Sequence, residues 1–541
     1  MKNNLSQLDS YGNEILDQNK IELEPREEAE LTGKLEMRIE NEDETSNDNS
    51  SSPITHLLID EPNTGRRIQI TKNQEKRPID REEMLICTNT EPKDRFHIVY
   101  IILIIHGIAI LMPWNMFINA TEYFTDHKLT LQLKNGTQIE SKYKEYFLSN
   151  VGIAAQIPNV LFNVLNIFFH LGETHSTEGY THRVLGSIII ELIFMILTVI
   201  LAIIDTSEWI TLFFYLTMLT VIILNIVNGI YQNSVYGFSS RLPMKYTNAI
   251  VTGSNVCGTF TALMNIITIW LSPNKRIAAI YFFASSILIL FFAFVTFFML
   301  KKNHYYRYHW NQSLYNKSLT NGDTGKISTS IDTDPIKSED LIFTSSSSLN
   351  DGKGQSKRPP YLYVFKFVWK QCLNVFLVFF ITLSTFPVIQ SGIKPIDPEF
   401  FGSIEKTQTY YIAVCCFLIF NACAMFGSIA PNFIIFPGPE KLWIPVISRF
   451  LFIPFFMLCN YVPDRRQWPV WIQSDFLYVF GGILMGFSSG YYSSLSMMYA
   501  PKSVPNQKYA GVAAMMAAAS LVSGIFFGIN FSYFLAWLIR Q

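Results

Sequence analysis

Four side chains with chemical capability interrupt apolar stretches of the sequence: Trp114, Gln232, Glu191 and His106. An indole can stack on a flat ring, and an amide can both donate and accept hydrogen bonds. A carboxylate or an imidazole can hold a proton or face a cation. Simpler interpretations exist: an aromatic belt for Trp114, an interhelical hydrogen bond for Gln232 or His106, and a contact with lipid headgroups for Glu191. For His106 and Glu191 we favour the simpler interpretation.

Long apolar segments surround these residues and predict a membrane protein. Hydrophobic residues make up 49% of the 541 positions and charged residues only 16%. A helix needs about 20 apolar residues to cross a bilayer. We therefore predict an all-α polytopic membrane protein with eleven transmembrane helices. The expected helices are 97–120, 148–170, 183–204, 209–240, 246–272, 278–300, 364–390, 409–436, 442–461, 473–500 and 507–538.

Charge divides the chain into four parts. Residues 1–95 are polar and acidic, which predicts a disordered cytosolic tail, and helices one to six occupy 96–300. The segment 301–362 is rich in Lys and Arg, which favours a cytosolic, largely disordered linker, and helices seven to eleven occupy 363–541. This topology places the N-terminus in the cytosol and the C-terminus outside.

The same topology places the loop between the first two helices outside the cell. Its sequon, Asn135-Gly136-Thr137, makes Asn135 a predicted N-glycosylation site. Arg449 lies early in the ninth predicted helix, and we expect its long side chain to reach the cytosolic surface. The net charge of −1 gives no reason to expect a nucleic-acid partner.

Small residues spaced by four predict where helices pack closely, because lipid gives helices little hydrophobic reason to associate. Three helices carry such rows: Ala249, Gly253 and Cys257; Gly482, Gly486 and Gly490; and Ser520, Gly524 and Gly528. We interpret the rows as structural packing. The alternative is a set of smooth faces that slide during a conformational cycle.

Several motifs follow one another in an order that resembles a known family. The first helix contains Leu111-Met112-Pro113-Trp114-Asn115-Met116-Phe117-Ile118. Later helices contain Gln232 followed by Gly237 and Leu242-Pro243, then Thr382-Leu383-Ser384-Thr385-Phe386-Pro387, Arg449-Phe450-Leu451-Phe452-Ile453-Pro454 and Gly490-Tyr491-Tyr492-Ser493-Ser494. Together they resemble the equilibrative nucleoside transporter family (solute carrier family 29) over residues 92–540, with some divergence.

The resemblance implies a major-facilitator-like fold with one helix missing. Bundles of six and five helices would rock about a central site, giving alternating access. By the same resemblance, Trp114 would stack on a nucleobase and Gln232 would bind its edge, while Leu111 and Ile118 would form an apolar wall. Asn233 stands where the family usually has glycine, so this face is more polar than usual.

The eighth helix departs from the family pattern. Ala424 and Ser428 stand where the family usually has an Asp and an Arg that hold each other and contact the sugar. Both charges are lost together, which avoids an unpaired charge in the membrane. The resemblance therefore does not extend to ribose recognition by that pair, and Asn421 and Ser428 remain as predicted polar contacts with substrate.

We predict facilitative transport of nucleosides or nucleobases by a monomer that needs no cofactor or metal. The expected partners are the substrate and the lipid bilayer, and the expected location is the plasma membrane, with endolysosomal membranes as the alternative. An organic-cation or monoamine carrier using Glu191 is a second hypothesis, and a non-transporting receptor or scaffold is a third. An intramembrane enzyme is the least expected function, because the sequence has no paired membrane aspartates and no HExxH motif. The cluster His170, Glu173, His175 and His182 lacks metal-site spacing and is interpreted as a solvated loop.

Overall fold

The computed structural model describes residues 55–60, 67–72, 91–120, 123–132, 138–140, 143, 147–169, 177–271, 275–320 and 360–541. The chain divides into two units, Met1–Met84 and Leu85–Gln541. Asn135 lies outside the described residues, as do His170, Glu173 and His175. The predictions made for these four residues therefore stay predictions.

The first unit contains a two-stranded antiparallel sheet. Its strands are β1 (Thr55–Asp60) and β2 (Arg67–Lys72), and Leu57 pairs with Ile70 across them. The prediction of a disordered tail does not hold for these two segments. β1 contains the apolar run Leu57–Ile59, and β2 alternates isoleucine with polar residues, but the polar composition of the tail as a whole concealed both.

The second unit is helical, and its long helices fall on the segments predicted from the sequence. Its described α-helices, apart from α11, are α4 (Ile98–Asn119), α6 (Phe147–Phe169), α7 (Thr177–Ile203), α8 (Ile210–Ser239), α9 (Met244–Leu271), α10 (Lys275–Lys302), α12 (Tyr361–Thr385), α13 (Ile404–Tyr411), α14 (Ile419–Ile429), α15 (Trp443–Ser448), α16 (Phe452–Met457), α17 (Asp475–Lys502) and α18 (Ala510–Ile539). Short segments complete it: η1 (Arg95–His97), η2 (Phe124–Lys128), η3 (Ser207–Trp209), η4 (Gln390–Gly392), η5 (Ile412–Leu418), η6 (Ala430–Asn432), η7 (Arg449–Leu451), η8 (Gln507–Tyr509), β3 (Thr130–Gln132) and β4 (Gln138–Glu140).

Local sequence explains several of these helix ends. The Ser474 hydroxyl accepts a hydrogen bond from the backbone N–H of Leu477 and so caps α17. The seventh predicted helix extended to residue 390, but α12 ends at Thr385. Phe386 is extended there, because a following proline disfavours the helical backbone and cannot donate to the helix.

Within the described residues, nine helical segments are long and apolar enough to cross a membrane. The prediction of eleven is therefore met only in part by length and composition. The ninth predicted helix is the short apolar segment Trp443–Met457, which is below the length of about 20 residues that a straight span needs. The tenth, α17, is long, but its many Gly and Ser residues make it less apolar.

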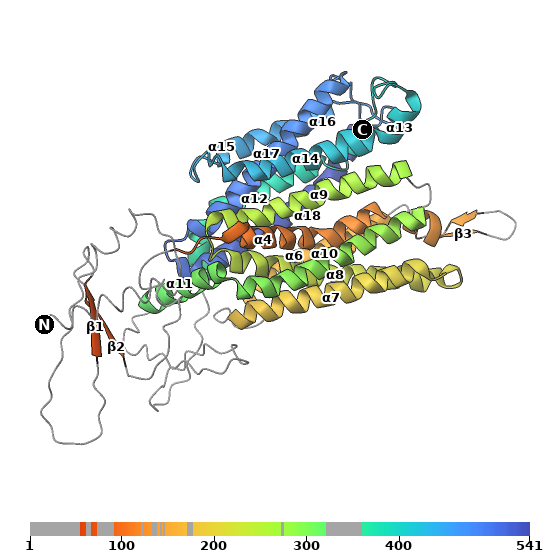
Figure 1. Cartoon of the computed structure of the whole chain (residues 1–541). Coiled ribbons are helices and arrows are strands. Elements are labelled where there is room, and N and C mark those ends of the chain that lie inside the picture. The colour runs from red at the N-terminus through yellow and green to blue at the C-terminus, as the bar shows by residue number, and fades with distance from the viewer. Residues whose placement is uncertain are drawn as a thin grey trace, which may run out of the picture. The chain divides into compact units, whose positions relative to one another are not determined.

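We call α4 to α10 the N-terminal half of the bundle and α12 to α18 the C-terminal half. In Figure 1 the two halves run from orange to green and from cyan to blue. The halves meet along α9, which packs on α14 and α17, and along α18, which packs on α6 and α8. Each half therefore contributes one helix to the interface: α9 from the N-terminal half and α18 from the C-terminal half.

Glycines allow the closest helix contacts, as the small-residue rows predicted. A β-carbon at Gly253 of α9 would collide with the carbonyl oxygen of Ile104 on α4, and one at Gly490 of α17 would collide with that of Ala424 on α14. Gly524 of α18 lies equally close to α12. All three contacts join helices of the same half, so these rows act in structural packing rather than as a surface between the halves.

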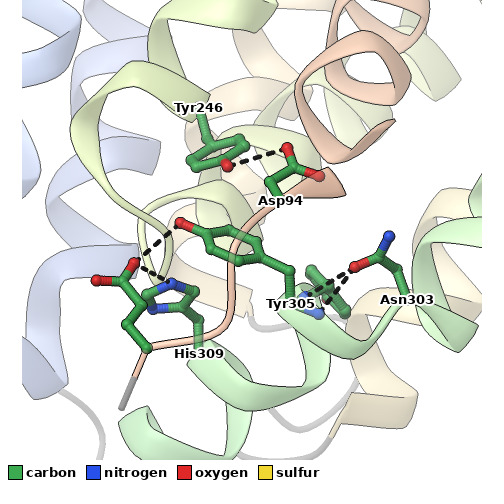
Figure 2. Close-up of polar contacts among 7 residues, drawn as sticks. Asp94, Tyr246, Asn303, Tyr305 and His309 are labelled. Atoms are coloured by element: carbon green, nitrogen blue, oxygen red, sulfur yellow. Dashed lines mark hydrogen bonds and ion pairs between the residues drawn. The ribbon is translucent and has the colours of Figure 1, made fainter. Parts of the chain in front are cut away.

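One helix was not expected from the sequence. The predicted linker begins with α11 (His304–Thr320), which follows α10 after a single residue, Asn303. The side-chain oxygen of Asn303 accepts backbone N–H groups of Tyr305 and Tyr306 and so caps α11 (Figure 2). The average composition of residues 301–362 had suggested a disordered segment. The cap at Asn303 is a local signal for a helix that an average over the segment does not show.

Polar contacts hold α11 against the start of the N-terminal half. Its Tyr305 hydroxyl donates to Glu91 (3.2 Å), and His309 Nε2 lies 3.0 Å from the same carboxylate. Figure 2 shows the neighbouring bond from the Tyr246 hydroxyl to Asp94. Burial lowers the pKa of His309, and Glu91 partly offsets that effect. The segment before α4, the start of α9 and α11 therefore form one cluster.

Candidate functional site

A small pocket lies between α4 and α8. Its lining residues are Pro113, Trp114, Phe117, Val221, Leu224, Asn225 and Asn228. The α4 residues are one and three positions from Trp114, and the α8 residues recur every three or four positions, so each set shares one helix face. The pocket therefore combines aromatic, aliphatic and amide groups, as a site for a flat polar ring requires.

Two residues predicted to form the apolar wall lie on the other side of Trp114. Successive residues turn by about 100° around a helix, so Leu111 and Ile118 flank Trp114 on the side opposite Pro113 and Phe117. Only Pro113 and Phe117 join Trp114 in the pocket with α8. Helical spacing alone does not say which side of α4 faces α8, so these two lining residues could not be predicted from it.

A row of amides continues along α8 from the pocket. Asn225, Asn228 and Gln232 are spaced by three and four residues, and all three are buried. The Asn225 amide donates to the Val221 carbonyl, whereas the Asn228 side-chain oxygen has no partner among the described residues. Gln232 lies one turn beyond Asn228, so the predicted amide belongs to a longer polar row.

The neighbouring Asn233 joins helices instead of lining the pocket. Its amide donates to the side-chain and backbone oxygens of Asn163 on α6 and to the Met515 carbonyl on α18. The residue is fully buried and therefore ties the two halves together. The extra polarity that it gives α8 lies on this interface rather than on the pocket side.

The C-terminal half places Asn421 and Ser428 along α9, not in the Trp114 pocket. Asn421 lies against Gly258 and donates to the Phe417 carbonyl. The Ser428 hydroxyl donates to Met425, and its carbonyl accepts from Asn248 of α9. In the arrangement described, these two predicted site residues therefore contact the opposite half.

His106 and Glu191 are both fully buried in the N-terminal half. His106 Nδ1 lies 2.6 Å from the Tyr231 hydroxyl of α8, which confirms the predicted interhelical hydrogen bond. The favoured interpretation of Glu191, a carboxylate reaching toward the headgroups, is wrong. Position 191 lies in the middle of α7, too far from the helix end for a glutamate to reach the surface.

Arg449 also departs from its predicted place. It is 2% exposed and points inward, donating to Thr382 of α12 (2.7 Å) and Ser488 of α17 (3.0 Å). Hydroxyls on two neighbouring helices offer the guanidinium better partners than the expected cytosolic surface. The sequence signal was the group of Ser and Thr residues in the neighbouring motifs.

Comparisons with known proteins identify the family. Residues 216–537 match a family model described as nucleoside transporter. The chain belongs to the nucleoside transporter family. The resemblance found in the sequence is thereby confirmed, and the chain is a multi-pass membrane protein of a transporter family rather than a family of enzymes.

Relatives that match this family member do so over most of its length. It is 28% identical to Equilibrative nucleoside transporter 3 of Rattus norvegicus over 420 residues, 77% of this chain and 84% of the relative. It is 26% identical to Equilibrative nucleoside transporter 1 of Homo sapiens over 471 residues, 83% of this chain and 99% of the relative. A solved structure of the proton:xylose symporter XylE, of the major facilitator superfamily, aligns with a TM-score of 0.50 at 12% identity, covering 82% of this chain and 87% of that one. That likeness shows a major-facilitator-like fold.

Proposed function

We propose that this transporter moves nucleosides and nucleobases down their concentration gradients. The observation that carries the proposal is the pocket in which Trp114 meets Asn225 and Asn228, with Gln232 one turn beyond. The indole can stack on a base, and the amides can donate to and accept from its polar edge. Both features suit a flat heteroaromatic ring.

The amide row also suits the altered eighth helix. Ala424 and Ser428 carry no charge with which to hold a ribose, so recognition would depend on the base and on neutral hydrogen bonds. The Asn228 oxygen, buried without a partner among the described residues, is one acceptor that a substrate N–H or hydroxyl could satisfy. We therefore expect weak discrimination between nucleosides and free bases.

Alternating access between the halves would supply the transport cycle. We count eleven spans arranged six plus five, with α15–α16 as the ninth and α17 as the tenth. Contacts between the halves gather where α8 ends and α9 begins: Gly511 packs on Gly237, and Asn248 donates to the Ser428 carbonyl. With the linker in the cytosol, this conformation is closed on the cytosolic side.

The remaining features of the proposal concern the setting of the protein. We place it in the plasma membrane as a monomer, with its N-terminus in the cytosol and Gln541 outside, and with a glycan on Asn135. The organic-cation hypothesis is weakened because both Glu191 oxygens are sealed from solvent and cannot touch such a substrate in this conformation. A receptor or scaffold would show no flux.

Uptake of labelled uridine, adenosine and adenine into proteoliposomes tests the function. Trp114→Ala should raise KM by about 5- to 150-fold, because base–aromatic stacking contributes roughly 1–3 kcal/mol. Trp270→Ala is the matched control, since Trp270 of α9 is 74% exposed and is not one of the residues that line the pocket. Absence of saturable uptake of all three compounds would sink the function, and equal effects of the two variants would sink the site.

A further inference from the structure

Glu191 is a buried acid that the proposed substrate site does not use. It lies in the middle of α7, a helix that packs on α8 and α10, and is 0% exposed. Neither carboxylate oxygen has a hydrogen-bond partner within the part of the chain that the structure describes. A carboxyl group in this position is expensive to keep and has no evident structural use.

Few titratable groups face this acid. Tyr231 of α8 lies close enough for the charge of Glu191 to act on its phenol, and the phenol is in turn hydrogen-bonded to His106 of α4. The second imidazole nitrogen of His106 has no described partner. Helix α10 carries no titratable residue between Tyr281 and Lys301. The acid, the phenol and the imidazole therefore form an isolated buried cluster.

Physics restricts what the acid can hold. An isolated carboxylate in an apolar interior costs far more than a neutral acid, so Glu191 must carry a proton or acquire a partner when it ionises. A metal ion would need about six oxygen ligands, whereas the neighbours offer one phenol and one imidazole. An organic cation cannot contact oxygens that are sealed from solvent. The proton is the ligand that fits.

We propose that Glu191 is a proton-binding site and that a proton moves with the substrate. The inference rests on the proposed transport function and modifies one part of it, because the proton gradient then drives transport together with the substrate gradient. An O–H bond forms between a carboxylate oxygen and a proton from the external solution, and the site closes as in this structure. When the halves part on the cytosolic side, water reaches Glu191, the O–H bond breaks, and the proton leaves to the cytosol. No electron is transferred.

Tyr231 connects the buried acid to the proposed substrate site. Tyr231 directly precedes Gln232, the last amide of the row on α8. An ionised Glu191 would attract the Tyr231 hydroxyl away from His106 and turn this part of α8. Protonation of the acid and the position of the substrate-binding amide are thereby coupled, and Tyr231 and His106 act as positioning residues.

Proteoliposome uptake with the internal pH fixed near neutrality tests this coupling. Uptake of labelled adenosine by the unmodified protein should rise several-fold when the external solution is made acidic. Glu191→Gln should remove the dependence on external pH, because glutamine resembles the neutral acid and cannot release a proton. Glu208→Gln, which changes an exposed carboxylate beyond the far end of the same helix, should keep it.

The outcomes separate the two proposals. No uptake by the unmodified protein at either pH overturns the transport function. Uptake that is equal at both pH values, or pH dependence retained in Glu191→Gln, overturns the proton site alone. Should Glu191→Gln be inactive, infrared difference spectra decide. The carbonyl band of a protonated carboxylic acid should be missing from Glu191→Gln and present in Glu208→Gln, and a band present in both overturns the proposal.

Discussion

Glu191 in the N-terminal half and Arg449 in the C-terminal half are both buried ionisable side chains, and they differ in what surrounds them. Glu191 on the third helix lies within electrostatic range of Tyr231 of the fourth, whose hydroxyl is hydrogen-bonded to His106 of the first. Arg449 lies on the ninth predicted helix and binds Thr382 of the seventh and Ser488 of the tenth. The same three places in the helix order, six helices apart, are connected in both halves.

The difference lies in the hydrogen bonds. The guanidinium of Arg449 donates to two hydroxyls, and Thr382 is itself joined to Ser489 at 3.1 Å. Glu191 has no such partner among the described residues. A guanidinium stays charged at any accessible pH, whereas a carboxyl can change its protonation state. The comparison therefore assigns a fixed structural charge to the C-terminal half and a variable one to the N-terminal half.

Removing Arg449 should have the largest effect. Arg449→Ala deletes two charge-assisted hydrogen bonds and leaves a large cavity, so we expect a loss of about 2–4 kcal/mol in stability. Thermal unfolding in detergent, followed by tryptophan fluorescence, measures the change. Glu191→Gln serves as the matched buried-charge variant and should shift the midpoint much less. Equal shifts would remove the contrast between the halves.

A second contrast concerns glycine. Gly490→Ala places a methyl group against the Ala424 backbone carbonyl in the C-terminal half. Since backbone cannot swing aside, we expect a cost of about 1–3 kcal/mol from forced separation of α14 and α17. Gly186→Ala on α7 meets open space and should be neutral or stabilising by up to about 1 kcal/mol. Similar midpoints for both variants would contradict the close contact.

A third contrast compares the polar groups that each half offers to substrate. Gln232→Ala should raise KM for adenosine by about tenfold, the equivalent of roughly one hydrogen bond. Asn421→Ala should have a smaller effect, because Asn421 already donates to the Phe417 carbonyl and lies against Gly258. The measurement is the KM for adenosine uptake by each of the two variants. A larger effect at Asn421 would move the centre of recognition to the C-terminal half.

Sequence alone predicted the long helices to within a few residues, because uninterrupted apolar length is a strong signal. It also predicted the His106 hydrogen bond and the close glycine contacts. Polar side chains were harder. The surroundings of Glu191 and Arg449 depend on residues more than thirty positions away, and no local pattern shows whether a charged group points inward.

The pocket shows the same limit at finer scale. Trp114 was predicted from its motif, but the rotation of α4 against α8 decides that Pro113 and Phe117 line this pocket with it. Leu111 and Ile118 lie on the other side of Trp114 and stay predicted substrate contacts. Rotation of one helix against another is a tertiary property. The α11 helix was not predicted for a different reason, which is local rather than tertiary. Its cap at Asn303 is a short-range feature in a segment whose average composition suggested disorder.

The smallest expected effect concerns α11, which packs against the segment before α4 and the start of α9. The Arg241 guanidinium lies 3.7 Å from the ring centre of Trp310 on α11. Arg241→Lys keeps the charge but loses the flat stacking surface, so α11 should be held less tightly by about 0.5–1 kcal/mol. Amide hydrogen exchange in α11 should then quicken by about two- to fivefold. Arg465→Lys, an exposed change in the C-terminal half, is the control. Unchanged exchange in Arg241→Lys would mean that the Glu91, Tyr305 and His309 contacts hold α11 without help from this stacking.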